Sequence, residues 1–410
     1  MRVLLIGSGG REHALAEKLL TSPALEELFW LPGNAALEGR VSKVTDIHPN
    51  DGPSITTWAR RVAIDLAVIG PEMPLLAGVS DCLEEVGIPC FAPSRAAAQI
   101  EGSKAFAKEL MVQAGVPTAR FRTVANAEEA LAVVEEWGAP LVIKADGLAG
   151  GKGVVVALGR ETALQGARDL QGPGLVEEFL TGREVSFMVL AQGERFVPLV
   201  PSQDYKRIGD GGTGPNTGGM GAVASFQLLD EAQQRFICTQ VIAPVLKELS
   251  KAGTPFKGIL YAGMMLTPLG PKVLEFNARL GDPETQAILA LWEDDLLEVV
   301  TKVARGGLPE QLTWRYAQSL CLVLASQGYP GEYATGFPIR GLEGAAQGVS
   351  VYHAGTALAE DVVTAGGRVV ALATQAESLA KARAKVYQAA GEIEFQGKYY
   401  RKDIGKLPTI

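Results

Sequence analysis

Strand and helix patterns alternate along the first hundred residues of the chain. Residues 2–7 form an apolar run, RVLLIG, that predicts a buried strand, and a glycine-rich turn separates it from a helical pattern at 11–20. Further strand-like runs lie at 28–31, 65–70 and 88–92. Because strands that alternate with helices favour a parallel sheet with helices on both faces, we predict an N-terminal α/β domain over residues 1–100.

A helix and a glycine-rich hairpin follow this domain. Residues 102–115 show helical apolar spacing and end at a glycine. Strand patterns at 141–146 and 154–157 then flank a loop that holds several glycines. We therefore expect a lid-like subdomain at about 117–182.

Strand patterns dominate the chain from residue 177 onward. A glycine-rich stretch at 209–221 breaks them, which predicts a mainly antiparallel sheet that carries loops. Beyond residue 314, strand patterns and one final helix predict a small α+β domain over 315–410. The expected fold is therefore an α/β and α+β multidomain protein, with a central domain over 101–314.

Composition agrees with several packed domains and excludes some functions. The chain has 410 residues, 47% of them hydrophobic and 20% charged, which is typical of globular domains. A formal charge of -8 without a long basic run argues against nucleic-acid binding. The four cysteines are scattered and no apolar run is long enough to span a bilayer. We expect a soluble cytoplasmic protein without a membrane partner.

The first glycine-rich turn, from Gly7 to Gly10, precedes a helix and predicts an anion site. Its backbone amides and the positive end of the helix can approach a phosphate closely. A dinucleotide fingerprint would need a glycine where Glu12 stands, so a nicotinamide cofactor is disfavoured. The alternative is that these glycines only allow tight packing of strand and helix.

The loop at 146–154 combines glycines with Lys152, and Lys144 lies on the strand before it. Glycines with lysines suit a polyphosphate, although the pattern departs from that of a P-loop. A hairpin that closes over phosphates fits better. The alternative is an ordinary mobile surface hairpin.

Charged residues gather after an apolar strand near residue 275. Glu275 and Asn277 are two positions apart, so both point to one face of the strand and can offer oxygen ligands to Mg²⁺. Arg279 follows on the same face, and Asp282 and Glu284 lie in the next turn. The alternative for the first pair is a solvated strand end.

The segment at 203–221 places Asp204, Lys206, Arg207 and Asp210 just ahead of a run of glycines. Such a composition suits a loop that wraps a small polar substrate, and the alternative is a disordered surface loop. The three histidines are dispersed, and none is predicted to be a catalytic base.

Read in order, these motifs resemble the glycinamide ribonucleotide synthetase family of ATP-grasp ligases. The most specific segments are GPNTGGMG at 214–221 and RLGDPETQ at 279–286, and similar stretches extend from GSGGREHALA at residue 7 to YRKDIG at residue 400. The resemblance implies that ATP drives the joining of glycine to 5-phosphoribosylamine through glycyl phosphate, in purine synthesis. It implies ATP and Mg²⁺ or Mn²⁺ as cofactors, and we expect a monomer or weak homodimer.

The resemblance also implies roles for individual positions. The residues implied to bind ATP are Lys104, Lys144, Gly150, Gly151, Lys152, Gly153, Glu177, Glu178, Phe179, Leu180 and Glu184. Those implied to bind the substrates are Gly9, Gly10, Asn34, Gly70, Pro71, Glu72, Asp204, Lys206, Gly218 and Gly219. Glu275 and Asn277 match metal ligands, while Asp204, Arg279 and Asp282 match residues around the reacting groups.

Some positions depart from the family pattern. The chain has PGNAA at 32–36 and AVAS at 222–225, and the stretch at 168–175 is shorter than in many relatives. Around Gly263 it lacks the extra carboxylate of many ATP-grasp enzymes, which leaves the ligands of a second metal open. Two other functions remain: an ATP-grasp ligase for a different acid or amine, and a nucleotide-binding protein without catalysis.

Overall fold

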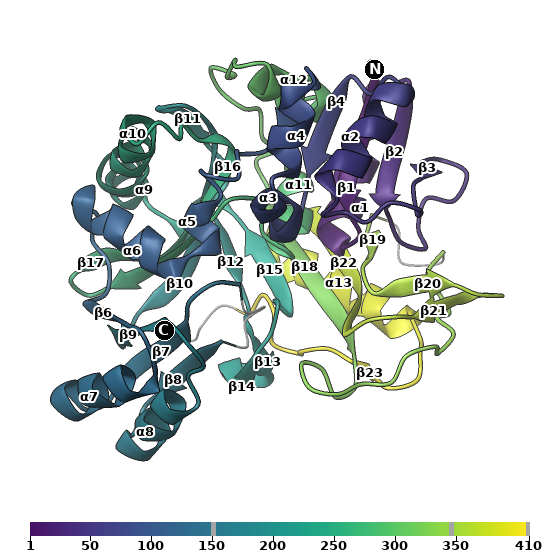
Figure 1. Ribbon diagram of the computed structural model, residues 1–410. Helices are drawn as coiled ribbons and strands as arrows, with labels where there is room; N and C mark the ends of the chain where they lie inside the picture. The colour runs from purple at the N-terminus through teal and green to yellow at the C-terminus, as the bar shows by residue number, and fades with distance from the viewer. Residues whose placement is uncertain (149–152, 344–347, 407–410) are drawn as a thin grey trace.

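The computed structural model describes residues 1–148, 153–343 and 348–406. Figure 1 shows the purple N-terminal domain next to the yellow C-terminal part, with a small subdomain formed by α7, α8 and their sheet projecting at the lower left. This arrangement of α/β and α+β units confirms the predicted fold class.

The N-terminal domain contains a five-stranded parallel sheet, as predicted. Its order is β3-β2-β1-β4-β5, with every pair parallel. The strands are β1 (Arg2–Gly7), β2 (Glu27–Pro32), β3 (Ser42–Lys43), β4 (Leu66–Ile69) and β5 (Cys90–Phe91). The helices are α1 (Gly10–Leu19), α2 (Gly52–Arg61), α3 (Glu72–Ala77) and α4 (Val79–Glu85). Because β1 and β4 are parallel neighbours, the turns that follow them meet at one edge of the sheet.

The projecting subdomain is an antiparallel sheet of order β6-β9-β7-β8 with its own core. Its elements are β6 (Phe121–Val124), α7 (Ala127–Trp137), β7 (Leu141–Ala145), β8 (Val154–Ala157), α8 (Arg160–Arg168) and β9 (Gly174–Glu178). The predicted hairpin is confirmed, because β7 pairs with β8 in antiparallel register. Three residues expected to contact ATP, Gly150, Gly151 and Lys152, lie outside the described residues.

A large sheet of long and short strands forms the middle of the molecule. All neighbouring strands along its main path are antiparallel. Its order is β17-β16-β10-β12-β15-β18-β22-β19, with β11 paired to β10 and β23 to β18. Its strands are β10 (Arg183–Gln192), β11 (Arg195–Pro198), β12 (Ser202–Asp204), β15 (Gly221–Ala224), β16 (Lys257–Thr267), β17 (Gly270–Asn277), β18 (Gln318–Ser326), β19 (Ser350–His353), β22 (Arg368–Ala376) and β23 (Lys398–Tyr399). The sheet continues from the central part into the C-terminal part through the pairing of β15 with β18.

Helices and two small hairpins complete the chain. The hairpins are β13 (Arg207–Gly209) with β14 (Thr213–Asn216) and β20 (Thr356–Leu358) with β21 (Val362–Thr364). The remaining α-helices are α5 (Gln99–Gly102), α6 (Lys104–Gln113), α9 (Glu231–Ile237), α10 (Ala243–Lys251), α11 (Glu284–Leu289), α12 (Leu296–Ala304) and α13 (Leu379–Glu392), and a π-helical stretch at Cys238–Ile242 joins α9 to α10. Among the described helices, none combines the length and the apolar character that crossing a bilayer requires.

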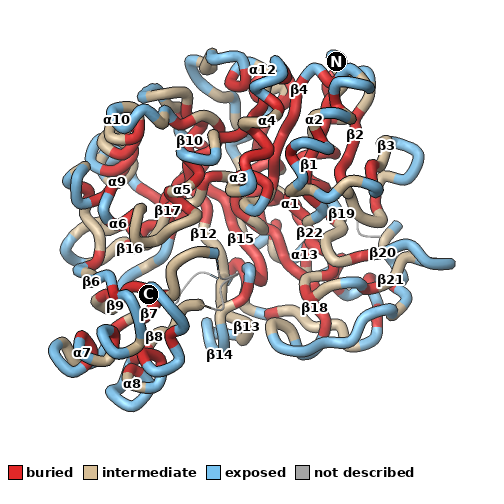
Figure 2. The backbone as a smooth tube through the Cα atoms, in the orientation of Figure 1, coloured by how far each residue is buried: buried red, intermediate tan, exposed pale blue. Residues whose placement is uncertain are grey.

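One apolar core joins the N-terminal domain to the large sheet. Ile69 and Leu75 of the first domain belong to the same buried cluster as Leu260 of β16 and Phe276 of β17. Figure 2 shows this buried material running through the centre of the molecule, whereas α7 and α8 lie at its exposed rim. The carboxyl edge of the parallel sheet is therefore held in a fixed position next to β17, which carries the predicted metal ligands.

Candidate active site

Glu275 and Asn277 lie on the last three residues of β17, as the alternation of the strand predicts. In the pairing with β16, Glu275 lies opposite Gly263 and Asn277 lies opposite Tyr261. A Cβ added to Gly263 would touch Glu275 Cγ at 3.4 Å, so a larger side chain there would crowd the carboxylate. A carboxylate and an amide oxygen next to this open position suit a hard divalent ion.

Lys206 brings the glycine-rich loop to this strand. Its Nζ lies 3.5 Å from Glu275 Oε1 and 3.5 Å from Glu184 Oε2, so one ammonium group bridges two carboxylates. The positive charge of Lys206 lowers the pKa of Glu275 to about 2, against the opposing effect of burial. Three residues expected in the ATP, metal and substrate sites are thus brought together.

Two of the predicted phosphate-binding lysines lie on neighbouring elements beside this carboxylate. Lys104 is the first residue of α6, where the Asp146 side chain accepts from its backbone N–H at 2.6 Å and from Ser103 Oγ. Lys104 Nζ donates to the carbonyl of Gly147 at 2.6 Å, which ties the start of the predicted lid loop to the helix. Burial lowers the pKa of Lys104, and the negative charge of Glu275 opposes this effect.

Lys144 on β7 belongs to a buried group that the sequence reasoning identified only in part. Its Nζ lies 3.0 Å from Glu177 Oε1 on β9, and Lys108 Nζ on α6 lies 3.1 Å from the other oxygen of the same carboxylate. Lys108 was missed because its position falls in the apolar face of a helix, where a lysine is rare without a partner. The signal available in the sequence was a lysine within the apolar face of the helix, four residues after Lys104.

The segment expected to contact adenine, Glu177 to Leu180, begins on the last two residues of β9. Glu178 accepts from Lys272 Nζ at 2.7 Å and from the backbone N–H of Arg120 at 3.0 Å. Phe179 and Leu180 come next and are half-buried. These contacts connect the small subdomain to β17, as expected of a hinge segment.

Four polar side chains gather where β10, β12, β16 and α11 meet. Glu284 Oε1 accepts from Tyr261 OH at 2.6 Å and from Ser186 Oγ at 3.2 Å. Asp204 Oδ1 is buried and has no hydrogen-bond partner among the described residues. Burial and the charge of Glu284 raise the pKa of Asp204 well above its ordinary value. Two carboxylates at this place favour a bound cation or a shared proton.

Sequence reasoning found Glu284 only as part of a charged turn and missed Tyr261. The position of Tyr261 on β16, two residues before Gly263, was the signal that could have placed it on the same face.

Asp282 is held by an arginine from the C-terminal part of the chain. Arg368 Nη2 lies 3.3 Å from Asp282 Oδ2, and Arg368 Nη1 donates to the carbonyls of Asp282 and Gly218 at 2.7 Å and 2.6 Å. Burial disfavours the ionised carboxyl, but the positive charges of Arg368 and Arg11 lower the pKa of Asp282. Arg368 was not expected in the site, although it lies in the motif TAGGRVVAL at 364–372.

Arg279 lies beyond the end of β17 and does not continue the face of Glu275 as expected. The strand ends at Asn277, and Arg279 forms ion pairs with Oε1 of the buried Glu101 at 2.8 Å and with Oε2 of the partly exposed Glu72 at 3.3 Å. Glu101 Oε2 also accepts from the backbone N–H of Ala278 at 2.8 Å. Arg279 therefore links the turn after β4, which includes the expected substrate residues Gly70 and Pro71, to the strand of the metal ligands.

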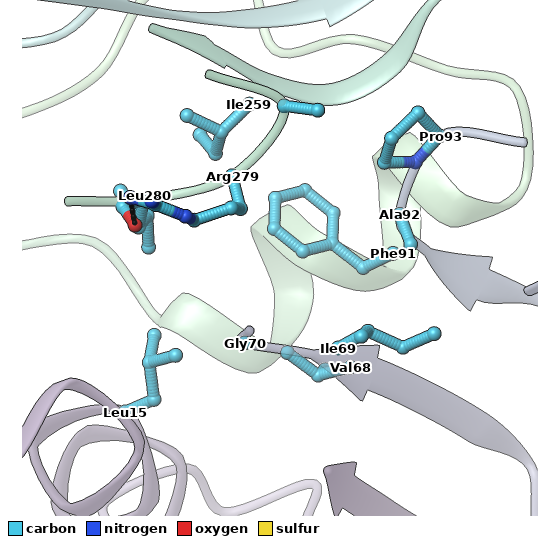
Figure 3. Close-up of a pocket in the computed structure, with 11 residues that line it drawn as sticks. Leu15, Val68, Ile69, Gly70, Phe91, Ala92, Pro93, Ile259, Arg279 and Leu280 are labelled. Carbon is cyan, nitrogen blue, oxygen red and sulfur yellow. Dashed lines mark hydrogen bonds between the residues drawn. The ribbon is translucent and has the colours of Figure 1, made fainter. Parts of the chain in front are cut away.

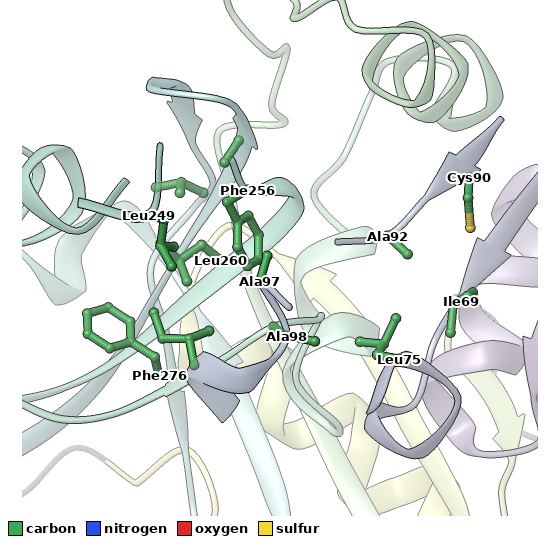
Figure 4. Packing of buried hydrophobic residues seen from close by; sticks show 14 of the residues in the cluster. Ile69, Leu75, Cys90, Ala92, Ala97, Ala98, Leu249, Phe256, Leu260 and Phe276 are labelled. Carbon is green, nitrogen blue, oxygen red and sulfur yellow. The ribbon is translucent and has the colours of Figure 1, made fainter. Parts of the chain in front are cut away.

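A small cavity lies beside Arg279. Figure 3 shows it between Phe91, Ile69 and Leu280, and its volume of about 10 Å³ is near the lower limit for one water molecule. It is too small for a nucleotide or a sugar phosphate, whereas the charged side chains around Lys206 are partly exposed.

The first glycine-rich turn has a packing role. Gly9 N–H donates to Glu12 Oε2 at 2.7 Å, and the buried Glu12 side chain fills the space that a Cβ on Gly7 or Gly70 would need. Contact with a phosphate by Gly9 and Gly10 stays a prediction.

Asn34 holds the loop after β2 against the C-terminal part. Its amide group donates to the carbonyls of Ser8 at 2.9 Å and His353 at 2.8 Å. The amide nitrogen of Asn34 thus makes two hydrogen bonds within the protein. A role of Asn34 in substrate binding stays a prediction.

Gly219 lies against Asp204 and Pro283. Its φ of +111° is unfavourable for other residues, and a Cβ there would lie 2.7 Å from Asp204 Oδ1 and collide with the Pro283 ring. Gly218 donates from its backbone N–H to Tyr329 OH at 2.9 Å. These two glycines allow the loop to pack closely on Asp204, which lies with Glu284 in what we call the acidic cluster.

Within the described ranges, no three side chains of His, Cys, Asp or Glu converge as a ready-made metal cluster. The available protein ligands are instead one carboxylate and one amide oxygen, Glu275 and Asn277. Such a sparse oxygen set fits Mg²⁺, which commonly binds through one or two protein ligands together with substrate phosphates.

Comparisons with known proteins identify the family of the chain. The family models for the N domain, the ATP-grasp (A) domain and the C domain of phosphoribosylglycinamide synthetase match residues 1–101, 102–285 and 319–407. A phosphoribosylamine–glycine ligase of Brucella melitensis is 44% identical over 417 residues, which cover 99% of this chain and 97% of that protein.

Two solved structures extend the comparison. Phosphoribosylamine–glycine ligase from Thermotoga maritima has a TM-score of 0.85 and 32% identity, covering 98% of this chain and 100% of that one. Biotin carboxylase from Campylobacter jejuni has a TM-score of 0.75 at 18% identity, covering 97% and 92% of the two chains, and shares the fold. Glycinamide ribonucleotide synthetase is another name for the matched family, so the resemblance found in the sequence is confirmed. The chain belongs to the phosphoribosylglycinamide synthetase family, with the N, ATP-grasp and C domains of that family in order.

Proposed function

We propose that the residues around Lys206 form the active site of an ATP-dependent ligase that joins glycine to 5-phosphoribosylamine. The carboxylate of glycine attacks the γ-phosphoryl group of ATP and gives glycyl phosphate and ADP. The amine of phosphoribosylamine then attacks the acyl carbon, and phosphate leaves as the amide forms. Family membership supports this reaction, which belongs to purine biosynthesis.

One observation carries the assignment of the site. Lys206, from the loop expected to bind substrate, bridges Glu184 and Glu275, which are expected at the ATP ribose and at the metal. Three loops and strands that lie far apart in sequence thereby meet at one ammonium group. Phosphoryl transfer depends mainly on positioning and charge neutralisation, and this convergence supplies both.

The ATP phosphates would be bound by cations of α6 and β7. Lys104 lies at the N-terminus of α6, where the helix dipole adds to its positive charge. Lys144 lies on the strand that leads into the hairpin loop. Glu177 to Leu180 would contact the adenine through their backbone, Glu184 would hold the ribose, and the hairpin with Gly153 would close over the phosphates.

Glu275 and Asn277 would hold Mg²⁺ or Mn²⁺. A divalent ion bound there would neutralise charge on the transferred phosphoryl group. Glu275 is ionised over the physiological pH range because its pKa is about 2. It can therefore act as a ligand without first releasing a proton.

The substrates would lie between the acidic cluster and the edge of the parallel sheet. Asp204 is our candidate for contact with a substrate amine, because its buried Oδ1 has no partner among the described residues. Asp282, Gly218 and Gly219 would line the same region. Arg279 is assigned to holding the turn with Gly70, Pro71 and Glu72 in place, because its guanidinium is taken up by Glu72 and Glu101.

The remaining proposals concern the state of the protein in the cell. We propose a cytoplasmic enzyme, supported by cysteines that are unpaired in the structure, as expected in a reducing compartment. A monomer or weak homodimer is proposed, and sedimentation velocity over a range of protein concentrations would measure it.

The reaction itself is tested with purified protein, ATP, Mg²⁺, glycine and freshly prepared phosphoribosylamine. We expect release of ADP and phosphate in equal amounts to an amide identified by mass spectrometry. Reactions without glycine, and with alanine in its place, serve as controls. Phosphate release that does not depend on glycine would contradict the proposal, and activity only with another amino acid would indicate a related ligase.

A further inference from the structure

Two buried lysines share one buried carboxylate beneath the proposed phosphate site. Glu177 lies between Lys144 and Lys108, with distances of 3.0 Å and 3.1 Å to its two oxygens. The exposed fractions of the three side chains are 3%, 10% and 2%, in that order. Such a dense group of charges in the interior needs a reason, because taking each charge out of water costs free energy.

The ammonium group of Lys108 is buried and contacts Thr118, Phe121 and Glu177. Its Nζ donates to Thr118 Oγ1 at 2.7 Å and lies 5.5 Å from the centre of the Phe121 ring. Thr118 in turn donates to the carbonyl of Val273 on the strand of the metal ligands. Its ammonium group is therefore committed to protein contacts, and a direct contact with a substrate is not part of its role.

The charge count of the group explains why two lysines are present. Two ammonium groups and one carboxylate leave a net charge of +1 on the group. If Glu177 had Lys144 as its only partner, the two would form a closed neutral pair. Because Lys108 pairs with the second oxygen of Glu177, it neutralises the carboxylate. The positive charge of Lys144 therefore remains available to attract an anion.

We propose that Lys108 is a positioning residue for Lys144, acting through the shared Glu177 carboxylate so that Lys144 keeps its place and its effective charge for the ATP phosphates. This inference rests on the proposed role of Lys144 in binding ATP. It also fits the helix, because Lys104 and Lys108 are four residues apart and lie on the same side of α6. One helix thus supplies both a cation for the phosphates and the support for a second one.

Lys108 is charged near neutral pH in this environment. Burial lowers the pKa of Lys108 to about 8, and the attraction of Glu177 opposes the effect of burial. At pH 7 most of the protein therefore carries the ammonium form that the shared ion pair requires.

The test compares five variants by the KM for ATP, the kcat and the melting temperature, at pH 7 and saturating glycine and phosphoribosylamine. Lys108→Met keeps the length of the side chain and removes its charge, and we expect the KM for ATP to rise on the order of tenfold with a smaller change in kcat. Glu177→Gln and the double variant Lys108→Met/Glu177→Gln complete a cycle. In both Glu177→Gln and the double variant, no carboxylate neutralises Lys144. Loss of Lys108 should then have little further effect, so the KM for ATP of the double variant should lie within about threefold of that of Glu177→Gln.

A role of Lys108 in packing alone predicts a different pattern. The melting temperature would fall, but the KM for ATP would stay unchanged, and that result would overturn the inference. Lys398→Met is a matched control, because Lys398 is also largely buried and hydrogen-bonded to main-chain carbonyls in the C-terminal part. Its KM for ATP should equal that of the wild type.

Two further outcomes separate this inference from the proposed function. An unchanged KM in Lys144→Met would overturn the ATP role of Lys144, and this inference with it. A raised KM in Lys144→Met together with an unchanged KM in Lys108→Met would overturn this inference alone. If Lys108→Met does not fold, Lys108→Gln takes its place with the same expected results. Equal KM values in Glu177→Gln and the double variant, together with a raised KM in the single lysine variant, support the inference. A further tenfold rise in the double variant would contradict it, since Lys108 would then act without Glu177.

Discussion

Lys206 Nζ lies 3.5 Å from Glu275 Oε1, which brings the start of the glycine-rich loop to the last residues of β17. The two residues are 69 positions apart in sequence. Their contact connects the proposed substrate loop with the proposed metal site, and the predictions on catalysis follow from it.

Replacing Lys206 with Met should reduce catalysis far more than it reduces stability. The change removes the cation between Glu184 and Glu275 and leaves two like charges without a bridge. We expect kcat/KM to fall by about 10²-fold or more, as is typical for loss of a group that stabilises developing charge. Steady-state kinetics and thermal unfolding measure the two effects. The exposed Lys251→Met is the control, and equal activity of both variants would contradict the role of Lys206.

Replacing Glu275 with Gln should raise the concentration of Mg²⁺ needed for activity. The variant keeps the shape of the side chain but removes the charge that a divalent ion requires. We expect kcat to fall on the order of 10²-fold, with a melting temperature within a few degrees of the wild type. Glu194→Gln, at an exposed position in the turn between β10 and β11, is the control. An unaltered Mg²⁺ titration would show that Glu275 is not a ligand.

Replacing Gly219 with Ala should impair both stability and activity. The new Cβ would collide with the Pro283 ring and press on Asp204 Oδ1, and the φ of +111° adds strain. We expect a loss of about 1–3 kcal/mol in the free energy of unfolding, measured by denaturant titration, and a large loss of kcat. Gly253→Ala is a matched control, because Gly253 also has a positive φ but open space around it. Equal kinetic effects of both changes would contradict the packing argument.

Replacing Arg279 with Met should destabilise the protein more than any change at Glu275. It leaves the buried Glu101 and the partly buried Glu72 without their arginine, and breaking a buried pair costs about 3–5 kcal/mol. The double variant Arg279→Met/Glu101→Gln should recover part of that loss, because one uncompensated charge is removed as well. Denaturant unfolding gives the free energies of the wild type and the two variants. A stable Arg279→Met variant without activity would instead favour direct participation of Arg279 in the reaction.

Replacing Glu17 with Gln should destabilise the protein near neutral pH but have less effect in acid. Contacts with His13 and Arg40 outweigh burial and lower the pKa of Glu17 from 4.5 to about 2. A carboxyl group with a lowered folded pKa contributes stability above about pH 4.5 and loses it as the pH falls toward 2. The difference in unfolding free energy between wild type and variant should therefore shrink from pH 5 to pH 2.5. A difference that is constant over this range would contradict the assignment.

Local patterns were sufficient to predict most of the fold. The apolar runs at Arg2–Gly7 and Val154–Ala157 predicted a parallel strand and one strand of a hairpin, because buried strands favour apolar residues. The pairing of β15 with β18 was not predictable in this way. Residues 221–224 and 318–326 are far apart in sequence, and their contact depends on how whole domains pack.

The site was predicted where its residues lie on one element, and missed where partners come from elsewhere. Glu275 and Asn277 are two apart on a strand, so the strand period places them together. Lys108, Tyr261 and Arg368 act through residues of other elements, and nothing in their own local sequence identifies those partners. The direction of Arg279 was wrong for a related reason, because β17 ends two residues before it.

In the proposed reaction, glycine is activated as an acyl phosphate at the site around Lys206. This activation is tested most directly with glycine labelled by ¹⁸O in both carboxylate oxygens, together with ATP, Mg²⁺ and phosphoribosylamine. If the carboxylate attacks the γ-phosphoryl group, each amide formed leaves one labelled oxygen in the released phosphate, which mass spectrometry detects. Amide formation with unlabelled phosphate would contradict the account.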